Sequence, residues 1–376
     1  MSVLEPGKSV IVIGGGVIGV STAVHLARGG AEVTLVTESE LASGASGRSL
    51  SWLNSAGERS AAYHALRMSG IDRYRTLFAK DPQRDWLCFD GGLYWSAEEP
   101  QAVLARHAHE RSHGYDSHLV DASNLVTTTP GVDPQAIGTP SIFNPGEGWV
   151  SLPELIEYLS EEFRCLGGRL VEHAGWASVL IGQDQRVRGV ATSKAGEFTA
   201  GAVLVACGPQ TAKVIEPLGV TIPDASPLSM LVLTEPMPMA PKAVLNTPRV
   251  AMRPCPGSRL ALDHDWYEAL IEEGEDGECR IDRSVVEQLV DEASSVLDGG
   301  ERLAPASWKL GRKPIPGDGE PVFGELAEVP GCFVAFTHSG ATLALIAGEL
   351  LAGEILTGER HPMLGSFRPE RFTRPG

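Results

Sequence analysis

The sequence predicts an α/β fold, a parallel sheet with helices, interrupted by a β-rich domain. Short apolar runs rich in β-branched residues, typical of buried parallel strands, occur early, midway and late in the chain, at residues 9–13, 202–208 and 332–336. The intervening stretches differ in composition and contain further strand-like segments. We therefore expect one domain built from residues 1–60, 141–225 and 311–376, and a second domain built from residues 61–140 and 226–310.

A glycine-rich turn follows the first strand. The motif Gly14-Gly15-Gly16-Val17-Ile18-Gly19 leads into a helix over residues 20–28, which Gly29 and Gly30 end. Such glycines permit a tight turn and let the backbone approach a pyrophosphate at a helix N-terminus. The next strand ends at Glu38, near the position about 20 residues on where an acidic group accepts from a ribose hydroxyl. The order of strand, glycines, helix, strand and acid predicts a dinucleotide site.

The later elements follow from local patterns. Ser151 and Glu154 form an S-x-x-E capping box, which predicts a helix that Gly167 and Gly168 end. Apolar periodicity and turn residues predict four more helices, over residues 61–78, 100–112, 282–297 and 340–356. Strands are expected at residues 92–95, 169–171, 177–181, 187–192, 197–199 and 229–234.

Composition narrows the function classes. The 376 residues are 43% hydrophobic and 21% charged, as in ordinary globular enzymes. The net charge of −17 argues against binding to nucleic acid or to anionic membranes, so an anionic substrate needs a local cation. The six cysteines form no CxxC pair, which argues against a disulfide framework and a zinc ribbon. Residues 1–8 are too short and polar for a signal peptide, and no stretch approaches the length of a transmembrane helix, so we expect a cytoplasmic protein.

Three blocks of sequence carry a resemblance to a known family. They are the N-terminal fingerprint with Ser43-Gly44-Ala45-Ser46 after it, the run Val203-Leu204-Val205-Ala206-Cys207-Gly208-Pro209, and residues 311–324 with Thr337-His338-Ser339-Gly340-Ala341-Thr342. Together they resemble the FAD-dependent amino-acid oxidases and dehydrogenases, a family that includes D-amino-acid oxidase, D-amino-acid dehydrogenase, glycine oxidase and sarcosine oxidase. The resemblance implies a Rossmann-type FAD-binding domain (glutathione-reductase-like) with an inserted β-rich substrate domain.

The resemblance also implies roles for matching positions. Gly14, Gly16 and Gly19 would cradle the pyrophosphate, Val17 and Ile18 would also contact the cofactor, and Glu38 would hold the adenosine ribose. Gly44, Ala45, Ser46 and Arg48 would line the flavin, and Val179 would contact the adenine side. The strand end with Ala206, Cys207 and Gly208 would lie beneath the adenosine half, and Ser43 and Ser49 are further implied contacts. Gly340, Ala341 and Thr342 would open the last helix, whose positive end would stabilise the negative charge of reduced flavin.

The positions at which family variants tether flavin are occupied by other residues. Arg48 stands where a histidine would be, and Gly311 stands where a cysteine would be. We therefore expect non-covalent FAD.

The substrate carboxylate requires a cation. The family's arginine in GxRP aligns with Lys313, with Arg312 one residue earlier, and this exchange replaces a planar fork by a point charge. Trp52, His264 and His338 are further candidates for contact with substrate. His107, His109 and His113 indicate a solvated helix rather than a metal site, because only the last two share a helical face.

The resemblance implies oxidation of a CH–NH bond of an amino acid or an N-substituted or cyclic amino acid. A hydride would pass to flavin N5, and the resulting imine would hydrolyse. O2 or another acceptor would reoxidise the flavin. An FAD-dependent hydroxylase that uses NAD(P)H, a nicotinamide dehydrogenase, and a flavin-holding subunit of a larger dehydrogenase complex are the alternatives. The residues leave open whether the protein forms a homo-oligomer or joins a partner subunit.

Overall fold

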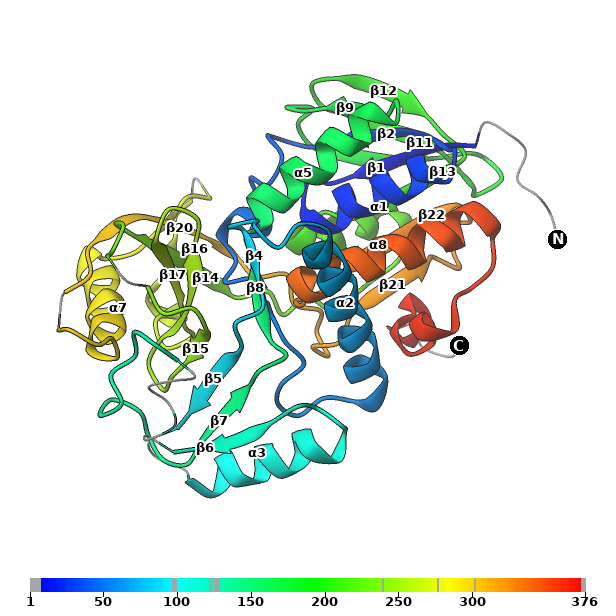
Figure 1. Ribbon diagram of the computed structural model, residues 1–376. Helices are drawn as coiled ribbons and strands as arrows, with labels where there is room; N and C mark the ends of the chain where they lie inside the picture. Colours follow the sequence, from blue (N-terminus) through cyan, green and yellow to red (C-terminus); the bar gives the residue numbers. More distant parts are fainter. Residues whose placement is uncertain are drawn as a thin grey trace. The chain divides into compact units, whose positions relative to one another are not determined.

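The computed structural model describes residues 8–96, 100–121, 124, 129–238, 240–275, 277–300 and 302–372. Residues 1–7, on which the expectation about a signal peptide mainly depends, lie outside this set. Contacts divide the chain into two compact units, and both units are shown in Figure 1. Unit 1 consists of Met1–Gly47, Leu152–Pro227 and Arg312–Gly376, and unit 2 consists of Arg48–Ser151 and Leu228–Gly311.

Two of the predicted domain boundaries are wrong. The first lies after Gly47 instead of residue 60, because β3 (Trp52–Leu53) pairs with β8 (Gly148–Val150) inside unit 2. The second lies after Ser151 instead of residue 140, because β7 (Ser141–Asn144) and β8 belong to sheets of unit 2. Short strands that pair only with distant segments give no local signal of the domain to which they belong.

Unit 1 is built on a six-stranded sheet. The strand order is β21 (Val322–Glu325), β22 (Cys332–Phe336), β13 (Ala202–Val205), β1 (Ser9–Ile13), β2 (Glu32–Val36) and β9 (Arg169–Val171). All neighbours are parallel except β21, which runs antiparallel to β22. The central strands are buried on both faces, as their continuous apolar sequences predict.

Different layers cover the two faces of this sheet. Helix α1 (Val17–Arg28) contacts both α5 (Leu152–Cys165) and α8 (Gly340–Thr357). Ile11, Ile13 and Val203 instead share an apolar core with a three-stranded antiparallel sheet. That sheet and the helix after β13 are β10 (Ala177–Ile181), β11 (Val187–Thr192), β12 (Gly196–Thr199) and α6 (Thr211–Ile215).

Helix α8 corrects the expectation about transmembrane length. Its 18 residues, with a mean hydropathy of 1.4, are long and apolar enough to cross a membrane. However, 67% of this stretch is buried inside the fold, and the helix packs along α1. These contacts are those of a core helix, which is apolar around most of its circumference for the same reason.

The predicted capping box of α5 is wrong. The N–H of Ser151 donates to the carbonyl oxygen of Trp86 at 2.7 Å, so it is not available to the Glu154 carboxylate. Glu154 Oε2 is buried without a hydrogen-bond partner among the described residues. Helix α5 nevertheless forms, since Leu155, Ile156 and other residues of its apolar face are buried.

Unit 2 contains an eight-stranded sheet. Its order is β20 (Pro305–Arg312), β14 (Leu228–Thr234), β17 (Arg259–Asp263), β16 (Ala251–Cys255), β15 (Val244–Asn246), β5 (Gly92–Trp95), β7 and β6 (His118–Val120). Strand β15 joins two halves that are distant in sequence, because it pairs in parallel with β5. Helix α7 (Arg283–Ser295) buries Val286 and Leu289 in the same core as Leu245 and Met252.

The remaining elements of unit 2 surround a small second sheet. Strand β8 pairs with β3 and with β4 (Leu87–Cys88), both antiparallel. The other elements are α2 (Ala61–Lys80), α3 (Pro100–Ser112), β18 (Glu272–Glu273) and β19 (Cys279–Arg280). Helix α2 begins at the N-cap Ser60, whose side chain accepts from the N–H of Tyr63.

Candidate active site

The glycine-rich turn between β1 and α1 permits only glycine at key positions. Gly14 has a φ of +121°, and a Cβ on it would lie 2.2 Å from the carbonyl oxygen of Ala206. A Cβ on Gly19 would lie 2.0 Å from the carbonyl oxygen of Gly14. Both distances are far below van der Waals contact, so the turn and the close packing of α1 depend on the absence of side chains.

Two helices of unit 1 begin next to each other. Gly16 is the N-cap of α1, and a Cβ on Gly340, the first residue of α8, would lie 4.0 Å from Val17 Cγ1. The N–H of Val17 donates to Ser46 Oγ at 3.0 Å, and Ile18 is buried beside it. Neither Gly16 nor the N-cap Ser339 makes a side-chain cap hydrogen bond. This edge therefore combines the positive ends of two helix dipoles with a glycine cradle, which fits a dinucleotide pyrophosphate.

Glu38 and Cys207 lie at the same edge of the sheet. Glu38 is exposed just after β2, and Cys207 follows β13, so the two flank the end of β1. Burial raises the pKa of the Cys207 thiol to about 12, and the negative charge of Glu38 adds to this increase. The contact of the Glu38 carboxylate with a ribose stays a prediction.

The other residues expected near the adenosine half differ in exposure. A Cβ on Gly208 would meet no atom within 4 Å, and its φ is +55°. Ala206 is buried, with its N–H donating to the carbonyl oxygen of Ile13 at 2.9 Å. Val179 lies on β10, is 9% exposed and packs in the apolar core, and its contact with the adenine side stays a prediction.

The small-residue segment after Glu38 crosses the boundary between the units. Ser43, Gly44, Ala45 and Ser46 belong to unit 1, whereas Arg48 and Ser49 belong to unit 2. A Cβ on Gly44 would meet no atom within 4 Å, which is an open position suited to a flat ligand. The short helix η1 spans Ala45–Arg48 and is only partly buried.

The two positions expected to tether flavin in family variants lie together in unit 2. A Cβ on Gly311 would lie 2.4 Å from the guanidinium carbon of Arg48. Burial lowers the pKa of Arg48. Arg48 therefore occupies the space that a side chain at residue 311 would need, and neither residue offers a nucleophile for a covalent bond.

The candidate cations of unit 1 lie at the end of β20, where Arg312 is the last residue of the strand and Lys313 comes directly after it. Arg312 Nη1 donates to the carbonyl oxygen of Ser226 at 3.1 Å, and the backbone N–H of Lys313 donates to that of Pro227 at 2.9 Å. Both side chains are half-buried. His338 is exposed just before α8, and Ala341 and Thr342 follow in its first turn. Their contacts with substrate or flavin stay predictions.

The candidate residues of unit 2 are held by hydrogen bonds. Trp52 Nε1 donates to Glu147 Oε2 at 2.7 Å. His264 Nδ1 lies 2.7 Å from Asp265 Oδ1, and its backbone N–H donates to the Tyr267 hydroxyl. The structure thus shows a buried carboxyl group beside Trp52, whereas His264 lies on a turn after β17.

Sequence reasoning missed Glu147. This residue is completely buried, and burial raises the pKa of its carboxyl group to about 8 despite hydrogen bonds from Tyr115 and Trp52. A Cβ on Gly92 would lie 2.0 Å from Glu147 Oε2, so that glycine makes room for the carboxyl group. The only signal in the sequence was a single acid in the otherwise uncharged run Gly146-Glu147-Gly148-Trp149.

A second feature that the site prediction left out lies on the same small sheet. Trp52 and Trp149 are cross-strand neighbours, and Arg253 is placed over the Trp149 ring at 5.2 Å. The Trp149 indole N–H is buried with no hydrogen-bond partner in the described part of the chain. Across the described ranges, no group of three or more metal-ligating side chains is placed to hold an ion.

Comparisons with known proteins agree with this geometry. The model of the family described as FAD dependent oxidoreductase (DAO) matches residues 9–354. Glycine oxidase of Pseudomonas aeruginosa is 26% identical over 368 residues, which cover 92% of this chain and 93% of that protein.

Solved structures share the fold. L-amino acid deaminase from Proteus myxofaciens, in complex with anthranilate, aligns with a TM-score of 0.84 and 18% identity, covering 100% of this chain and 95% of that chain. Glycine oxidase from Bacillus cereus aligns with a TM-score of 0.79 and 21% identity, covering 96% of this chain and 98% of that chain.

Proposed function

The chain belongs to the DAO family of FAD-dependent oxidoreductases, and from this we propose that it oxidises a CH–NH bond of an amino acid or an N-substituted or cyclic amino acid. The observation that carries the proposal is the match over residues 9–354, together with similarity to a glycine oxidase along 92% of the chain. FAD supplies the two-electron acceptor when bound. The proteins named above act on glycine or on L-amino acids by their titles, so membership alone does not select a D-substrate.

The chain's own residues would hold the cofactor at the edge of the unit 1 sheet. Gly14, Gly16 and Gly19 leave room for the pyrophosphate, and the positive end of the α1 dipole favours its charge. Glu38 accepts from a ribose hydroxyl. The N-terminus of α8, at Gly340, adds a positive potential at the same edge.

We assign the substrate carboxylate to Lys313. A carboxylate that leaves water needs a cation, and the overall charge of −17 cannot provide one. Lys313 aligns with the family's arginine and is half-buried next to the end of β20, which is the reason for assigning the contact to its ammonium group. A planar bidentate contact is thereby replaced by a point charge, which tolerates a wider range of carboxylate orientations.

Anaerobic bleaching of the flavin tests the proposal. Purified protein loaded with FAD is mixed, without oxygen or NAD(P)H, with glycine, sarcosine, proline and the D- and L-forms of other amino acids. Loss of the flavin absorption with at least one of these compounds is the expected result. Bleaching by NAD(P)H alone would instead identify a hydroxylase. Absence of any bleaching would favour a flavin-holding subunit, the second candidate, which the replacement of the family's arginine by Lys313 supports.

The substitution Lys313→Met tests the carboxylate contact. We expect kcat/KM to fall, mainly through a higher KM, because a buried carboxylate would lose its partner. The fall should correspond to a loss of about 2–5 kcal/mol in transition-state stabilisation. FAD content should stay normal. Lys309→Met is the matched control, since Lys309 is exposed on β20. Unchanged kinetics in both Lys313→Met and Arg312→Met would mean that the substrate is not an α-carboxylate.

We also propose that the enzyme works in the cytoplasm. The six cysteines all lie in the described part of the chain and form no disulfide bond, and Cys165 is exposed. Cysteines without disulfide bonds in this number are typical of a reducing compartment.

A further inference from the structure

Unit 2 buries an acid that neither the cofactor cradle nor the candidate cations use. Glu147 lies in the turn between β7 and β8 and is completely buried. A carboxyl group in such a place costs free energy unless hydrogen bonds satisfy its oxygens. A Cβ on Gly92 would lie 2.0 Å from Glu147 Oε2, so β5 makes room for this acid by carrying no side chain there. A polar group that the fold keeps at such a cost is a candidate for a role in function.

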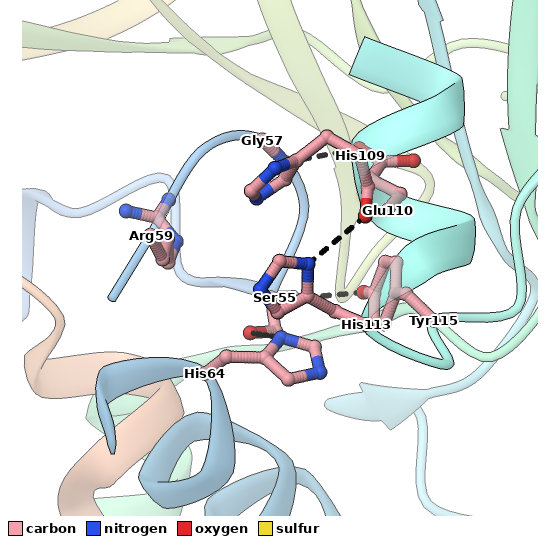
Figure 2. Close-up of a pocket in the computed structure, with 8 residues that line it drawn as sticks. All are labelled: Ser55, Gly57, Arg59, His64, His109, Glu110, His113 and Tyr115. Carbon is pink, nitrogen blue, oxygen red and sulfur yellow. Dashed lines mark hydrogen bonds between the residues drawn. The ribbon is translucent and has the colours of Figure 1, made fainter. Parts of the chain in front are cut away.

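Each oxygen of this carboxyl group has a donor. Oε2 accepts from Trp52 Nε1, and Oε1 accepts from the Tyr115 hydroxyl, each at 2.7 Å. The Tyr115 hydroxyl is fixed in turn, because it accepts from the backbone N–H of Ser55 at 2.9 Å, and Figure 2 shows this hydrogen bond. Glu147 therefore cannot turn without breaking two short hydrogen bonds, and it holds the indole nitrogen of Trp52 in one place.

The backbone fixes Trp52 as well. Its strand, β3, pairs with β8, and the N–H of Val150 donates to the carbonyl oxygen of Ser51 at 3.2 Å. Ser51, the residue before Trp52, is buried with a φ of +55°, a left-handed conformation that is uncommon for residues other than glycine. Strained backbone of this kind is concentrated at functional sites. The Trp52 side chain is thus held both at its backbone and at its ring.

The hydrogen bond to Glu147 decides what Trp52 can offer to a ligand. The indole N–H is the only polar group of this side chain, and it is directed at the buried carboxyl group. Trp52 is only partly buried. Its side chain therefore offers a ligand the apolar surface of a fixed ring, which stabilises contact with CH groups and cannot donate a hydrogen bond to a hydroxyl or an amide.

We propose that Glu147 is a positioning residue, which takes up the Trp52 N–H so that a fixed apolar ring faces the substrate and favours apolar side chains. This role rests on the proposed oxidation of an amino acid and on the predicted contact of Trp52 with substrate. Glu147 is completely buried, so it acts through Trp52 and does not touch the substrate itself. Of two amino acids of similar size, leucine and asparagine, the enzyme should prefer leucine by about tenfold.

Rates of anaerobic flavin reduction in the FAD-saturated enzyme test this role. We compare leucine with asparagine, in the enantiomer that reduces the wild-type flavin, in the wild type, Glu147→Leu and Glu147→Gln. Glutamine is the matched control, since its side-chain oxygen still accepts from the indole N–H. Glu147→Leu should lose most of the roughly tenfold preference, mainly through weaker binding of leucine and less through the limiting rate of reduction. Glu147→Gln should keep the preference, and both variants should keep their FAD.

A double-mutant cycle separates this role from a general loss of structure. Trp52→Phe removes the indole N–H, so Glu147→Leu should have no further effect on the preference in a Trp52→Phe background. An equal loss in both backgrounds would mean that Glu147 acts through another part of the fold, and it would overturn the proposal. A wild type that oxidises asparagine as well as leucine, or that oxidises only glycine, would overturn it too.

The indole proton of Trp52 gives a readout that does not depend on turnover. The chain has seven tryptophans, and the indole N–H signal that disappears in Trp52→Phe belongs to Trp52. This signal should lie at the same place in the wild type and Glu147→Gln and should move upfield in Glu147→Leu, because its acceptor is gone. Tyr115→Phe removes a single hydroxyl group and should cause a smaller shift in the same direction, so it replaces Glu147→Leu if that variant does not fold. A signal at the same place in every variant would contradict the proposal.

The two levels of the proposal fail in different ways. If no amino acid reduces the flavin of the wild type, the proposed function is wrong and the role of Glu147 falls with it. If leucine reduces the flavin at the same rate in the wild type, Glu147→Leu and Trp52→Phe, only the role of Glu147 is wrong.

Discussion

At the scale of single residues, a carboxyl group held neutral is the most consequential feature of unit 2. Glu147 is fully buried and accepts from Trp52 Nε1 and from the Tyr115 hydroxyl, each at 2.7 Å. Tyr115 in turn accepts from the N–H of Ser55 at 2.9 Å. These hydrogen bonds fix the orientation of the Trp52 indole, which therefore depends on an acid far away in the sequence.

The substitution Glu147→Gln should change how stability depends on pH. The folded pKa of about 8 lies above the ordinary value of 4.5, so between these values the folded state keeps a proton that the unfolded state releases. Stability therefore falls as pH rises through this window. In Glu147→Gln that fall should shrink by an amount on the order of a few kcal/mol, measured by urea unfolding at pH 5, 6, 7 and 8.

Glu157→Gln is the control for this experiment, because Glu157 is exposed on α5. Its pH dependence should match that of the wild type. If the unfolding free energy of Glu147→Gln depends on pH as steeply as that of the wild type, the buried carboxyl group is ionised in the folded protein.

At the scale of elements, the sequence predicts what local patterns determine. The strands at residues 9–13, 92–95 and 332–336 have the predicted limits, since each is a short apolar run ended by turn residues. The capping box failed because a distant carbonyl group, that of Trp86, competes for the N–H of Ser151. The parallel pairing of β15 with β5 could not be predicted either. It joins residues about 150 positions apart in the chain, and no local pattern indicates such a pairing.

The substitution Gly19→Ala tests the packing of α1. The new Cβ would lie 2.0 Å from the carbonyl oxygen of Gly14, a backbone atom that cannot move without opening the turn. We expect a loss of about 1–3 kcal/mol in stability together with weaker FAD binding. Gly353→Ala in α8 is the matched control, because a Cβ there meets no atom within 4 Å.

The control should stabilise the protein by about 0.5–1 kcal/mol through helix propensity, with FAD binding unchanged. Urea unfolding and FAD titration of both variants give the two quantities. Equal behaviour of Gly19→Ala and Gly353→Ala would show that the turn has room for a side chain and that the glycine cradle is not required.

At the scale of the whole molecule, the sequence predicts some parts of the candidate site and not others. The glycine turn of unit 1 follows from a motif, because Gly14 and Gly19 stand where the backbone packs too closely for a side chain, whereas the ribose contact of Glu38 stays a prediction. The environments of Glu147 and Trp149 could not be predicted, because they are created by segments that meet only in the folded chain. Burial and the balance of charge are properties of the fold as a whole, and they decide the protonation of these groups.

Retention of FAD should also be a property of the folded molecule alone. Arg48 and Gly311 occupy the positions where a tether would form, and neither side chain can bond covalently to flavin. Once acid unfolds the protein, the turn, the helix ends and Glu38 no longer form one site, so the cofactor has nothing to hold it. We expect one FAD per chain before treatment, and all of the yellow colour in the supernatant after acid precipitation. Unfolding in guanidinium followed by gel filtration is the control, and flavin should elute there apart from the protein. Colour that stays with the polypeptide in both experiments would mean that another residue of this chain forms a covalent bond to the cofactor.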